Sequence, residues 1–295
     1  MKNGKTVVIT GANGMLGEAV YAQFSKDWNV RAADVKLDVT KNLSVERFIK
    51  KVKPDAIVHL AALTDLEYCE LHPSEAYDVN ALGVANVLAP AIELGIPFVH
   101  ISTARIFNGK RRSYSEYDTA DPIGIYGKSK YAGEIIARAY AKSIIIRGGW
   151  MVGGGPQKDK KFVNKIIQRI NDKEKELQII DNTRGTISYT YDVARTIQYL
   201  LERRAYGIYH CVCDDETSRF EITKFIVREL GLENKIKISK VNSSRWSKEY
   251  FSPRPGSESL INSILKKMNP DLTRPWRVCL ADYLKRFDWL RLVRK

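Results

Sequence analysis

The 295-residue sequence contains no long apolar run, and it has only four cysteines, four methionines and four histidines. No apolar run approaches the roughly 18 residues that a membrane-spanning helix requires, so we expect no membrane span. The N-terminus passes from a short polar start, "MKNGK", directly into the strand-like "TVVIT". That order is not typical of a secretory signal peptide, and it predicts a cytoplasmic protein.

The four cysteines form no disulfide framework in a chain of this length. Cys211 and Cys213 lie in "YHCVCD", where strand alternation places His210 on the face opposite both sulfurs. Because the ligands of a zinc ion must converge on one point, this arrangement does not favour a zinc site. We therefore expect buried thiols and no metal.

The charge is strongly of one sign, since 48 basic residues face 34 acidic ones and give a formal net charge of +14. Such a balance favours anionic partners, which include nucleotides, nucleic acids and membrane surfaces. The basic residues are spread in small clusters, such as "GKRRS" and "KDKK". None is interleaved with aromatic residues or spaced as in nucleic-acid-binding motifs, so we expect a basic surface and no nucleic-acid partner.

Residues 1–150 alternate short β-branched runs with helical patterns. The predicted strands are "KTVVIT", "NVRAAD", "AIVHLA", "PFVHIS" and "SIIIRG", and the predicted helices span 15–26, 43–52, 74–94 and 129–141. Strands that alternate with crossover helices require a parallel sheet covered on both faces. The pattern therefore predicts an α/β fold with a doubly wound, Rossmann-type sheet and a dinucleotide-binding domain over residues 1–150.

The chain after Trp150 is richer in loops, with "GGGPQ" and "SPRPGS" as breakers. Residues 151–295 are therefore expected to form mainly a smaller, loop-rich α/β lobe that binds the substrate. The run "GIYHCVC", near 207–213, has the pattern of a further strand. We expect this strand to return to the sheet of the first domain.

Three glycines, Gly11, Gly14 and Gly17, lie directly after the first predicted strand and at the start of a predicted helix. Small residues there allow a tight turn, let the backbone approach a pyrophosphate and direct the helix N-terminus at its negative charge. Their spacing is GxxGxxG, one residue longer than the usual dinucleotide fingerprint. The position in the first βα unit predicts a bound dinucleotide.

Asp34 ends the second predicted strand, where a carboxylate accepts hydrogen bonds from the adenosine ribose and repels a 2′-phosphate. This position favours NAD. Arg31 stands close enough in sequence to leave NADP open, and Asp38 is a candidate contact to adenine.

The segment "YGKSKYAGE" places Tyr126 four residues before Lys130. Residues four apart share a helix face, so both side chains reach one site if a helix begins near position 126. A nearby ammonium stabilises a phenolate and lowers the pKa of the phenol, which predicts a general acid. Thr103, at the carboxyl end of a predicted strand, is placed to donate a hydrogen bond to a developing alkoxide.

The glycine turn, a Ser/Thr after the fourth strand and YxxxK together resemble the extended short-chain dehydrogenase/reductase superfamily. Within it, the chain is most similar to the dTDP-4-dehydrorhamnose reductase branch. Supporting segments run nearly end to end and include "HLAALTDLEYCELHPSEAYDVNALG", "STARIFNG", "YSEYDTADPIGIYGKSKYAGE", "IRGGWMVGGG", "SYTYDVAR" and "RPWRVCLADYL".

The resemblance implies reduction of a 4-keto deoxysugar carried on a nucleotide diphosphate, with NAD(P)H as hydride donor, and it leaves a homodimer open. The implied catalytic residues are Thr103, Tyr126 and Lys130. The implied dinucleotide contacts are Gly11, Asn13, Gly14, Met15, Leu16, Gly17, Asp34, Asp38, Val39, Ala61, Ala62, Asn80, Tyr126 and Lys130. The implied substrate contacts are Thr103, Arg105, Trp150, which would line the sugar pocket, and Arg254, which would face the diphosphate.

Departures from the pattern of the branch cluster at the substrate side. "STDYVFDG" becomes "STARIFNG", "GxNFV" becomes "KKFV" with Lys161 in place of asparagine, and "DQxGxPTYT" becomes "DNTRGTISYT". Arg105 is either a ligand for a phosphate or carboxylate or a surface residue. The sequence thus predicts the reaction class more firmly than the identity of the sugar.

Three other functions remain open. An epimerase or dehydratase of the same superfamily would keep the cofactor, although a dehydratase also needs a carboxylate beside the threonine, where Ala104 and Arg105 supply none. A non-catalytic, NAD(P)-binding regulatory subunit would explain the altered sugar positions. A nucleic-acid-binding protein would show a steep salt dependence of binding.

Overall fold

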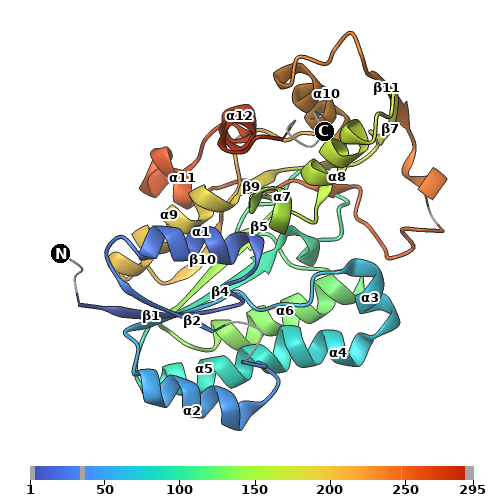
Figure 1. The fold of residues 1–295 in the computed structure, drawn as a ribbon. Helices are drawn as coiled ribbons and strands as arrows, with labels where there is room; N and C mark the ends of the chain where they lie inside the picture. Colours follow the sequence, from blue (N-terminus) through green and yellow to red (C-terminus); the bar gives the residue numbers. More distant parts are fainter. Residues whose placement is uncertain (1–3, 34–36, 247, 290–295) are drawn as a thin grey trace.

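Six parallel strands form a central sheet in the order β10-β5-β4-β3-β1-β2 (Figure 1). The computed structural model describes residues 4–33, 37–246 and 248–289. The strands are β1 (Thr6–Thr10), β2 (Asn29–Ala33), β3 (Ala56–His59), β4 (Phe98–Thr103), β5 (Ser143–Gly148) and β10 (Gly207–His210). The predicted α/β fold with a parallel, Rossmann-type sheet is confirmed.

The strand order reverses at β1, which lies between β2 and β3. The chain leaves β1 for β2 on one side and then crosses to β3 on the other. In open parallel sheets, such a switch point leaves a crevice outside the carboxyl ends of the strands, where ligands bind. The glycine turn that follows Thr10 lies at this position.

Helices cover both faces of the sheet (Figure 1). α1 (Met15–Phe24) and α9 (Thr190–Glu202) pack against Val7 and Ile9 of β1. α2 (Asn42–Val52), α5 (Gly83–Glu93) and α6 (Ile125–Arg138) cover the other face, where Val8 points. Alternate residues of the inner strands are therefore buried on opposite faces, which explains why β1, β3 and β5 read as nearly continuous apolar runs, whereas the edge strand β2 is partly exposed.

α6 begins earlier than the predicted helix at 129, because Gly124 is its N-cap with an extended backbone. The predicted helix over 74–94 is divided into α4 (Pro73–Tyr77), a π-helical turn η1 (Asp78–Leu82) and α5. α6 packs closely on this turn, since a Cβ at Gly133 would lie only 2.1 Å from the Asn80 carbonyl oxygen. α3 (Leu66–Leu71) precedes α4 on the same side, and η2 (Ala104–Ile106) follows β4.

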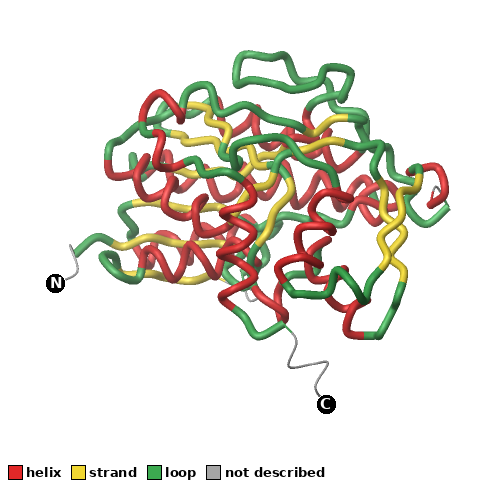
Figure 2. Tube along the Cα trace, turned by 90° about the horizontal axis from the view of Figure 1, so that it is seen from above, coloured by secondary structure: helices red, strands yellow, loops and turns green. Residues whose placement is uncertain are grey.

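The remaining elements form a second lobe with its own apolar core, in which Trp276 and Tyr283 are fully buried. Three short parallel strand pairs run through it: β6 with β9, β7 with β11, and β8 with β12 (Figure 2). Its elements are β6 (Trp150–Val152), α7 (Gly155–Lys158), α8 (Phe162–Asn171), β7 (Glu176–Ile180), β8 (Arg184–Gly185), β9 (Ile187–Tyr189), α10 (Arg219–Glu229), β11 (Lys237–Val241), η3 (Ser243–Trp246), β12 (Ser257–Glu258) and α12 (Trp276–Arg286). By contrast, α11 (Leu265–Met268) and η4 (Pro270–Leu272) pack with their Leu265 and Leu272 side chains against the core of the sheet domain.

The two parts of the chain are interleaved. After β9 the chain returns to the first part, where α9 packs beside α1 and β10 pairs in parallel with β5. It then enters the second lobe again through α10. Within residues 151–295, a long helix and an edge strand therefore belong to the sheet domain.

Candidate active site

The glycine turn after β1 is shaped by close backbone contacts. Gly11 has φ +65, and a Cβ there would lie 2.7 Å from the Ala61 backbone nitrogen. A Cβ at Gly17 would lie 2.4 Å from the Ala12 carbonyl oxygen. Both positions therefore require glycine, because the β1–α1 turn packs directly against the loop after β3.

Gly14 is the N-cap of α1 and provides no side-chain cap. The first N–H groups of a helix have no partner within the helix, so those of α1 are open to an anionic ligand beside the turn. This geometry fits the pyrophosphate of a dinucleotide. Asn13, Met15 and Leu16, which were predicted to contact the cofactor, belong to the same turn and first helical turn.

The remaining predicted cofactor residues lie around this turn in different ways. Ala61 and Ala62 follow β3, and the Ala61 N–H donates to the Thr10 hydroxyl at 3.4 Å. Asp38 is exposed and accepts hydrogen bonds from Thr40, which lower its pKa. Val39 is buried under α5, where a Cβ at Gly83 would press on it. Asp34 lies outside the described residues.

Asn80 supports the site through the backbone. Its side-chain oxygen accepts the Leu63 N–H at 2.9 Å, and its amide donates to the Leu63 carbonyl and the Ser129 hydroxyl, each at 3.0 Å. The fully buried amide thus joins the loop after β3 to α6. Because these partners occupy the amide, Asn80 holds the loop in place next to the predicted cofactor residues.

Tyr126 and Lys130 lie in the first turns of α6, and Thr103 ends β4. The Thr103 hydroxyl forms a hydrogen bond with the Tyr126 phenol and accepts the Arg105 N–H at 3.2 Å. The helix start at Ile125 places the tyrosine and the lysine on one face, as their spacing predicts. The structure therefore brings the threonine and the phenol together at the carboxyl end of the sheet.

Burial raises the pKa of Tyr126 above that of free tyrosine. The hydrogen bond with Thr103 and the charge of Arg105 lower it in part, but they do not reverse the effect of burial. The prediction that an ammonium neighbour makes this phenol more acidic is therefore wrong for this structure. The physical reason is that loss of hydration penalises the phenolate more than the nearby groups stabilise it.

Lys130 is 4% exposed, and burial lowers its pKa to about 8, against the opposing charge of Glu134. Glu134 lies one helical turn further along α6 and is fully buried. Its carboxylate accepts two hydrogen bonds from Arg147 of β5, at 2.6 and 3.1 Å, and one from the Ser102 hydroxyl at 2.6 Å. A buried ion pair thus joins α6 to two strands directly beneath the lysine.

Three of the four histidines are buried on the same face of the sheet as this ion pair. His59 and His100 stack with ring centroids 6.0 Å apart, and His59 Nδ1 bonds with the Thr10 hydroxyl at 2.8 Å. Burial lowers the pKa of His59 to about 3 and that of His210 to about 4. These rings are therefore neutral at physiological pH and add no charge near Lys130.

The lowered pKa of Lys130 predicts a specific pH dependence of stability. Lys130 keeps its proton up to its ordinary pKa of 10.5 in the unfolded chain but loses it near 8 in the folded protein. Between these values the unfolded state binds more protons, so the free energy of unfolding rises with pH. We expect wild type to gain stability relative to Lys130→Met between about pH 7.5 and 9.5, measured by urea unfolding. A constant difference between the two proteins over that range would contradict this assignment.

The predicted substrate residues lie on both parts of the chain. Arg105 donates to Glu258 of β12 at 2.8 Å, and both side chains are nearly buried. Arg105 is therefore not a surface residue. Trp150 packs over Gly185, where a Cβ would lie 2.5 Å from its ring. Arg254 pairs with Glu67 at 2.6 Å and donates to the Tyr250 and Ser252 carbonyls.

Sequence reasoning missed two residues that lie around Arg105 and Trp150. Arg219, at the start of α10, lies over the Trp150 and Phe162 rings, and Glu258 holds Arg105. No local motif marks either residue, because the segments that meet here are far apart in the chain. Glu134 could have been found, since it continues the helical face of Tyr126 and Lys130.

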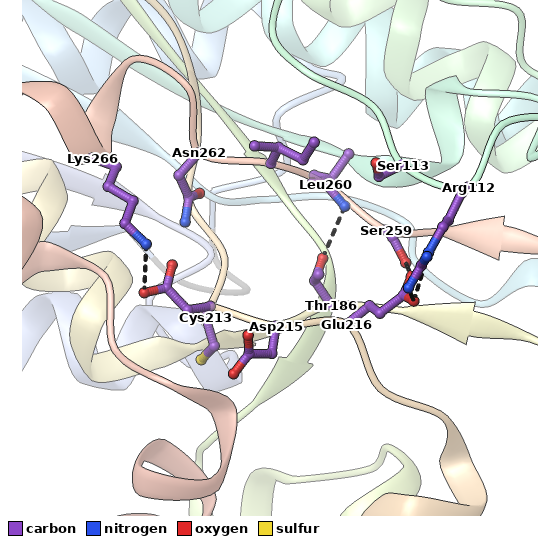
Figure 3. A pocket seen from close by; sticks show the side chains of 12 residues that line it. Arg112, Ser113, Thr186, Cys213, Asp215, Glu216, Ser259, Leu260, Asn262 and Lys266 are labelled. Atoms are coloured by element: carbon purple, nitrogen blue, oxygen red, sulfur yellow. Dashed lines mark hydrogen bonds and ion pairs between the residues drawn. The ribbon is translucent and has the colours of Figure 1, made fainter.

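A cavity of about 240 Å³ lies apart from these residues (Figure 3). Ion pairs between Arg112 and Glu216 and between Lys266 and Asp214 lie along it. None of the predicted catalytic or cofactor residues lines it. Its lining has three carboxylates, those of Asp214, Asp215 and Glu216, against two cations, so the cavity does not favour an anionic ligand.

The sequence matches the family model described as RmlD substrate binding domain over residues 5–289. It is 33% identical to the spore coat polysaccharide biosynthesis protein SpsK of Bacillus subtilis, over 95% of this chain and 96% of the relative. Both similarities therefore extend over nearly the whole chain.

Solved structures show the same relationship. A dTDP-4-dehydrorhamnose reductase from Clostridium acetobutylicum aligns with a TM-score of 0.89 and 31% identity, covering 95% of this chain and 99% of that one. The Bacillus anthracis dTDP-4-dehydrorhamnose reductase in complex with NADP aligns with a TM-score of 0.88 and 29% identity, covering 97% and 100%.

The fold and these similarities define an NAD(P)-dependent oxidoreductase of the extended short-chain dehydrogenase/reductase kind. Within that class, the chain belongs to the RmlD substrate binding domain family, the dTDP-4-dehydrorhamnose reductase branch. The resemblance seen in the sequence is confirmed.

Two further findings concern the described residues only. None of their helices is long and apolar enough to cross a membrane. Their histidines, cysteines and carboxylates include no group of three or more that could hold a metal ion. The four cysteines are free and buried, which confirms the prediction of buried thiols.

Proposed function

We propose that this protein reduces the 4-keto group of a nucleotide-linked deoxysugar with NAD(P)H. The observation that carries the proposal is the hydrogen bond between Thr103 and Tyr126 at the carboxyl edge of the sheet, with Lys130 one helical turn further along α6. The glycine turn of β1 lies at the same edge and fits a dinucleotide. The relatives named dTDP-4-dehydrorhamnose reductase support the substrate class, and the complex of one of them with NADP supports the cofactor.

The residues of the chain have separate roles in this reaction. The reduced nicotinamide supplies a hydride to the keto carbon when the cofactor is bound. The Tyr126 phenol donates a proton to the keto oxygen, and the Thr103 hydroxyl donates a hydrogen bond to it. The raised pKa of Tyr126 keeps the phenol protonated, so the acid is in its donor form until the oxygen becomes strongly basic.

Lys130 and Asn80 have supporting roles. Lys130 is proposed to contact the cofactor, and the charge of Glu134, one helical turn further along α6, favours its protonated form. Asn80 joins the loop after β3 to the helix that carries Tyr126. These contacts fix the position of the Tyr126 phenol relative to the glycine turn, and hydride transfer requires such a fixed geometry.

A substrate panel tests the proposal. The protein is incubated with NADPH or NADH and with dTDP- and UDP-linked 4-keto sugars, and the absorbance of the reduced nicotinamide is followed. We expect one cofactor oxidised for each ketone reduced. Catalysis without net cofactor consumption would identify an epimerase or dehydratase, and binding without any turnover would identify a regulatory subunit.

The structure favours the reductase over a dehydratase. Ala104 and Arg105 follow the threonine, and the nearby carboxylate of Glu258 is held by Arg105 at 2.8 Å. No free acid-base carboxylate is therefore provided beside Thr103 by these residues. A cytoplasmic location and a homodimer remain predictions, the latter testable by light scattering.

Asp34→Ala is expected to shift the cofactor preference. The Asp34 carboxylate is predicted to accept hydrogen bonds from the ribose hydroxyls. Its removal weakens the binding of NADH and relieves the repulsion of the 2′-phosphate of NADPH. We expect the ratio of the NADH to NADPH dissociation constants to rise about tenfold, as measured by quenching of tryptophan fluorescence. Asp172→Ala, at an exposed position at the end of α8, is the control. An unchanged ratio for Asp34→Ala would assign ribose recognition to another residue.

A further inference from the structure

Arg219 is a cation with aromatic contacts, and no carboxylate of the described residues forms an ion pair with it. Its guanidinium carbon lies 4.7 Å from the centroid of Trp150 and 4.8 Å from that of Phe162. A capping box formed by Ser218 and Glu221 fixes the start of α10 at this point. The side chain is therefore held in place by the helix start and by two rings.

The nearest carboxylate does not neutralise Arg219. Glu258 acts on Arg219 through its charge, but its Oε1 accepts a hydrogen bond from Arg105 at 2.8 Å. Within the described part of the chain, no carboxylate lies within ion-pair distance of Arg219. Burial lowers its pKa to about 10, so the guanidinium is poorly hydrated and remains charged. Such a group gains most from an anion that arrives with its ligand.

The location ties Arg219 to the reacting groups. The Arg105–Glu258 pair acts through its charges on both the Tyr126 phenol and Arg219. Arg219 lies over Trp150. Trp150 is the first residue of β6 and is separated from the end of β5 only by Gly149. An anion bound by Arg219 would thus lie near the ion pair whose charges also act on the phenol, which suits a substrate that carries both a ketone and a phosphate.

Arg254, which the resemblance implies as the contact to the diphosphate, is less available than Arg219 for binding a phosphate. Its guanidinium pairs with Glu67 at 2.6 Å and donates to two backbone carbonyls. Three of its five N–H donors are therefore already engaged. By contrast, a planar guanidinium with free N–H groups, such as that of Arg219, can bind a phosphate through two parallel hydrogen bonds.

We propose that Arg219, stacked on Trp150 and Phe162 beside the Arg105–Glu258 pair, binds the sugar-linked phosphate of a nucleoside diphosphate sugar and determines specificity for such substrates. This assignment rests on the proposed function, since it places the phosphate of the keto-sugar nucleotide. Arg219 is the anchor, and the Arg105–Glu258 pair acts through its charges on both this anchor and the proton donor.

Binding experiments without turnover test the assignment. Titration calorimetry measures the binding of thymidine 5′-diphosphate and of uncharged thymidine to the NADPH-loaded protein. We expect Arg219→Ala to weaken the binding of thymidine 5′-diphosphate about 10-fold to 100-fold. The affinities for thymidine and NADPH should change less than about twofold. Arg219→Lys should recover only part of the loss, because an ammonium cannot form the two parallel bonds.

Arg228→Ala is the matched control. Arg228 lies on the same helix, over the Phe225 ring at 4.9 Å, and pairs with Glu229 at 3.3 Å. We expect wild-type affinity for thymidine 5′-diphosphate in this variant. Wild-type affinity in a folded Arg219→Ala protein, judged by its melting temperature and NADPH binding, would overturn the assignment, and so would failure of the wild type to bind the diphosphate.

The experiment separates this inference from the proposed function. If Arg219→Ala loses the diphosphate but the wild type reduces no keto-sugar nucleotide, the binding assignment stands and the proposed reaction fails. If the wild type reduces such substrates and Arg219→Ala shows an unchanged KM, the reaction stands and the assignment of Arg219 is overturned.

Discussion

Tyr126→Phe is expected to lower kcat/KM for a 4-keto nucleotide sugar by about 10²-fold to 10⁴-fold, the range that a positioned general acid contributes. The substitution removes only the phenolic oxygen, which forms the hydrogen bond with Thr103. The ring and its packing on α6 remain. The dissociation constant of NADPH should therefore change little, and the loss should appear in kcat when both constants are measured.

Tyr131→Phe is the control for this variant. Tyr131 lies on the same helix and packs against the small apolar cluster that includes Ile106 and Phe107. We expect wild-type kinetics in this protein. Turnover by Tyr126→Phe within about threefold of wild type would remove the phenol from the mechanism, since a missing proton donor costs far more.

Glu134→Ala is expected to destabilise the protein by about 3–5 kcal/mol, because it leaves the buried Arg147 guanidinium without its carboxylate. Glu134 is fully buried and accepts hydrogen bonds from Arg147 and Ser102. The free energy of unfolding, measured by urea titration, reports the loss. Lys130 would also lose the charge that favours its protonated form.

Two variants make this expectation specific. Glu229→Ala removes an exposed carboxylate paired with Arg228 at 3.3 Å, and such surface pairs contribute at most about 1 kcal/mol. Glu134→Leu combined with Arg147→Met removes both charges and should recover part of the lost stability. A loss below about 1 kcal/mol for Glu134→Ala would show that water reaches Arg147 and replaces the carboxylate.

Much of the sheet could be predicted because its strands are buried on both faces. Runs such as "TVVIT" and "SIIIRG" leave no alternative to a covered parallel sheet, and the observed β1 and β5 match them closely. The predicted helix starts at residue 129, later than the observed start of α6 at Ile125, since the helical pattern of apolar residues begins only after the Gly124 cap. The π-helical turn at Asp78–Leu82 carries no sequence signal and arises from packing against Gly133.

The site could be predicted where one segment carries the chemistry. The glycine turn and the Tyr126–Lys130 spacing are local, so their placement follows from the element that holds them. The direction of the Tyr126 pKa could not be predicted, because burial depends on the whole fold. Glu258 and Arg219 come from distant segments that meet only after the second lobe has folded.

The return of the chain to the sheet has a practical consequence for dissection of the protein. A fragment that ends near residue 150 would lack α9 and β10, so it would expose the apolar side of α1 and leave β5 as an open edge. Exposed edge strands recruit other chains. Such a fragment is therefore expected to aggregate, and work on cofactor binding alone calls for point variants in the intact polypeptide.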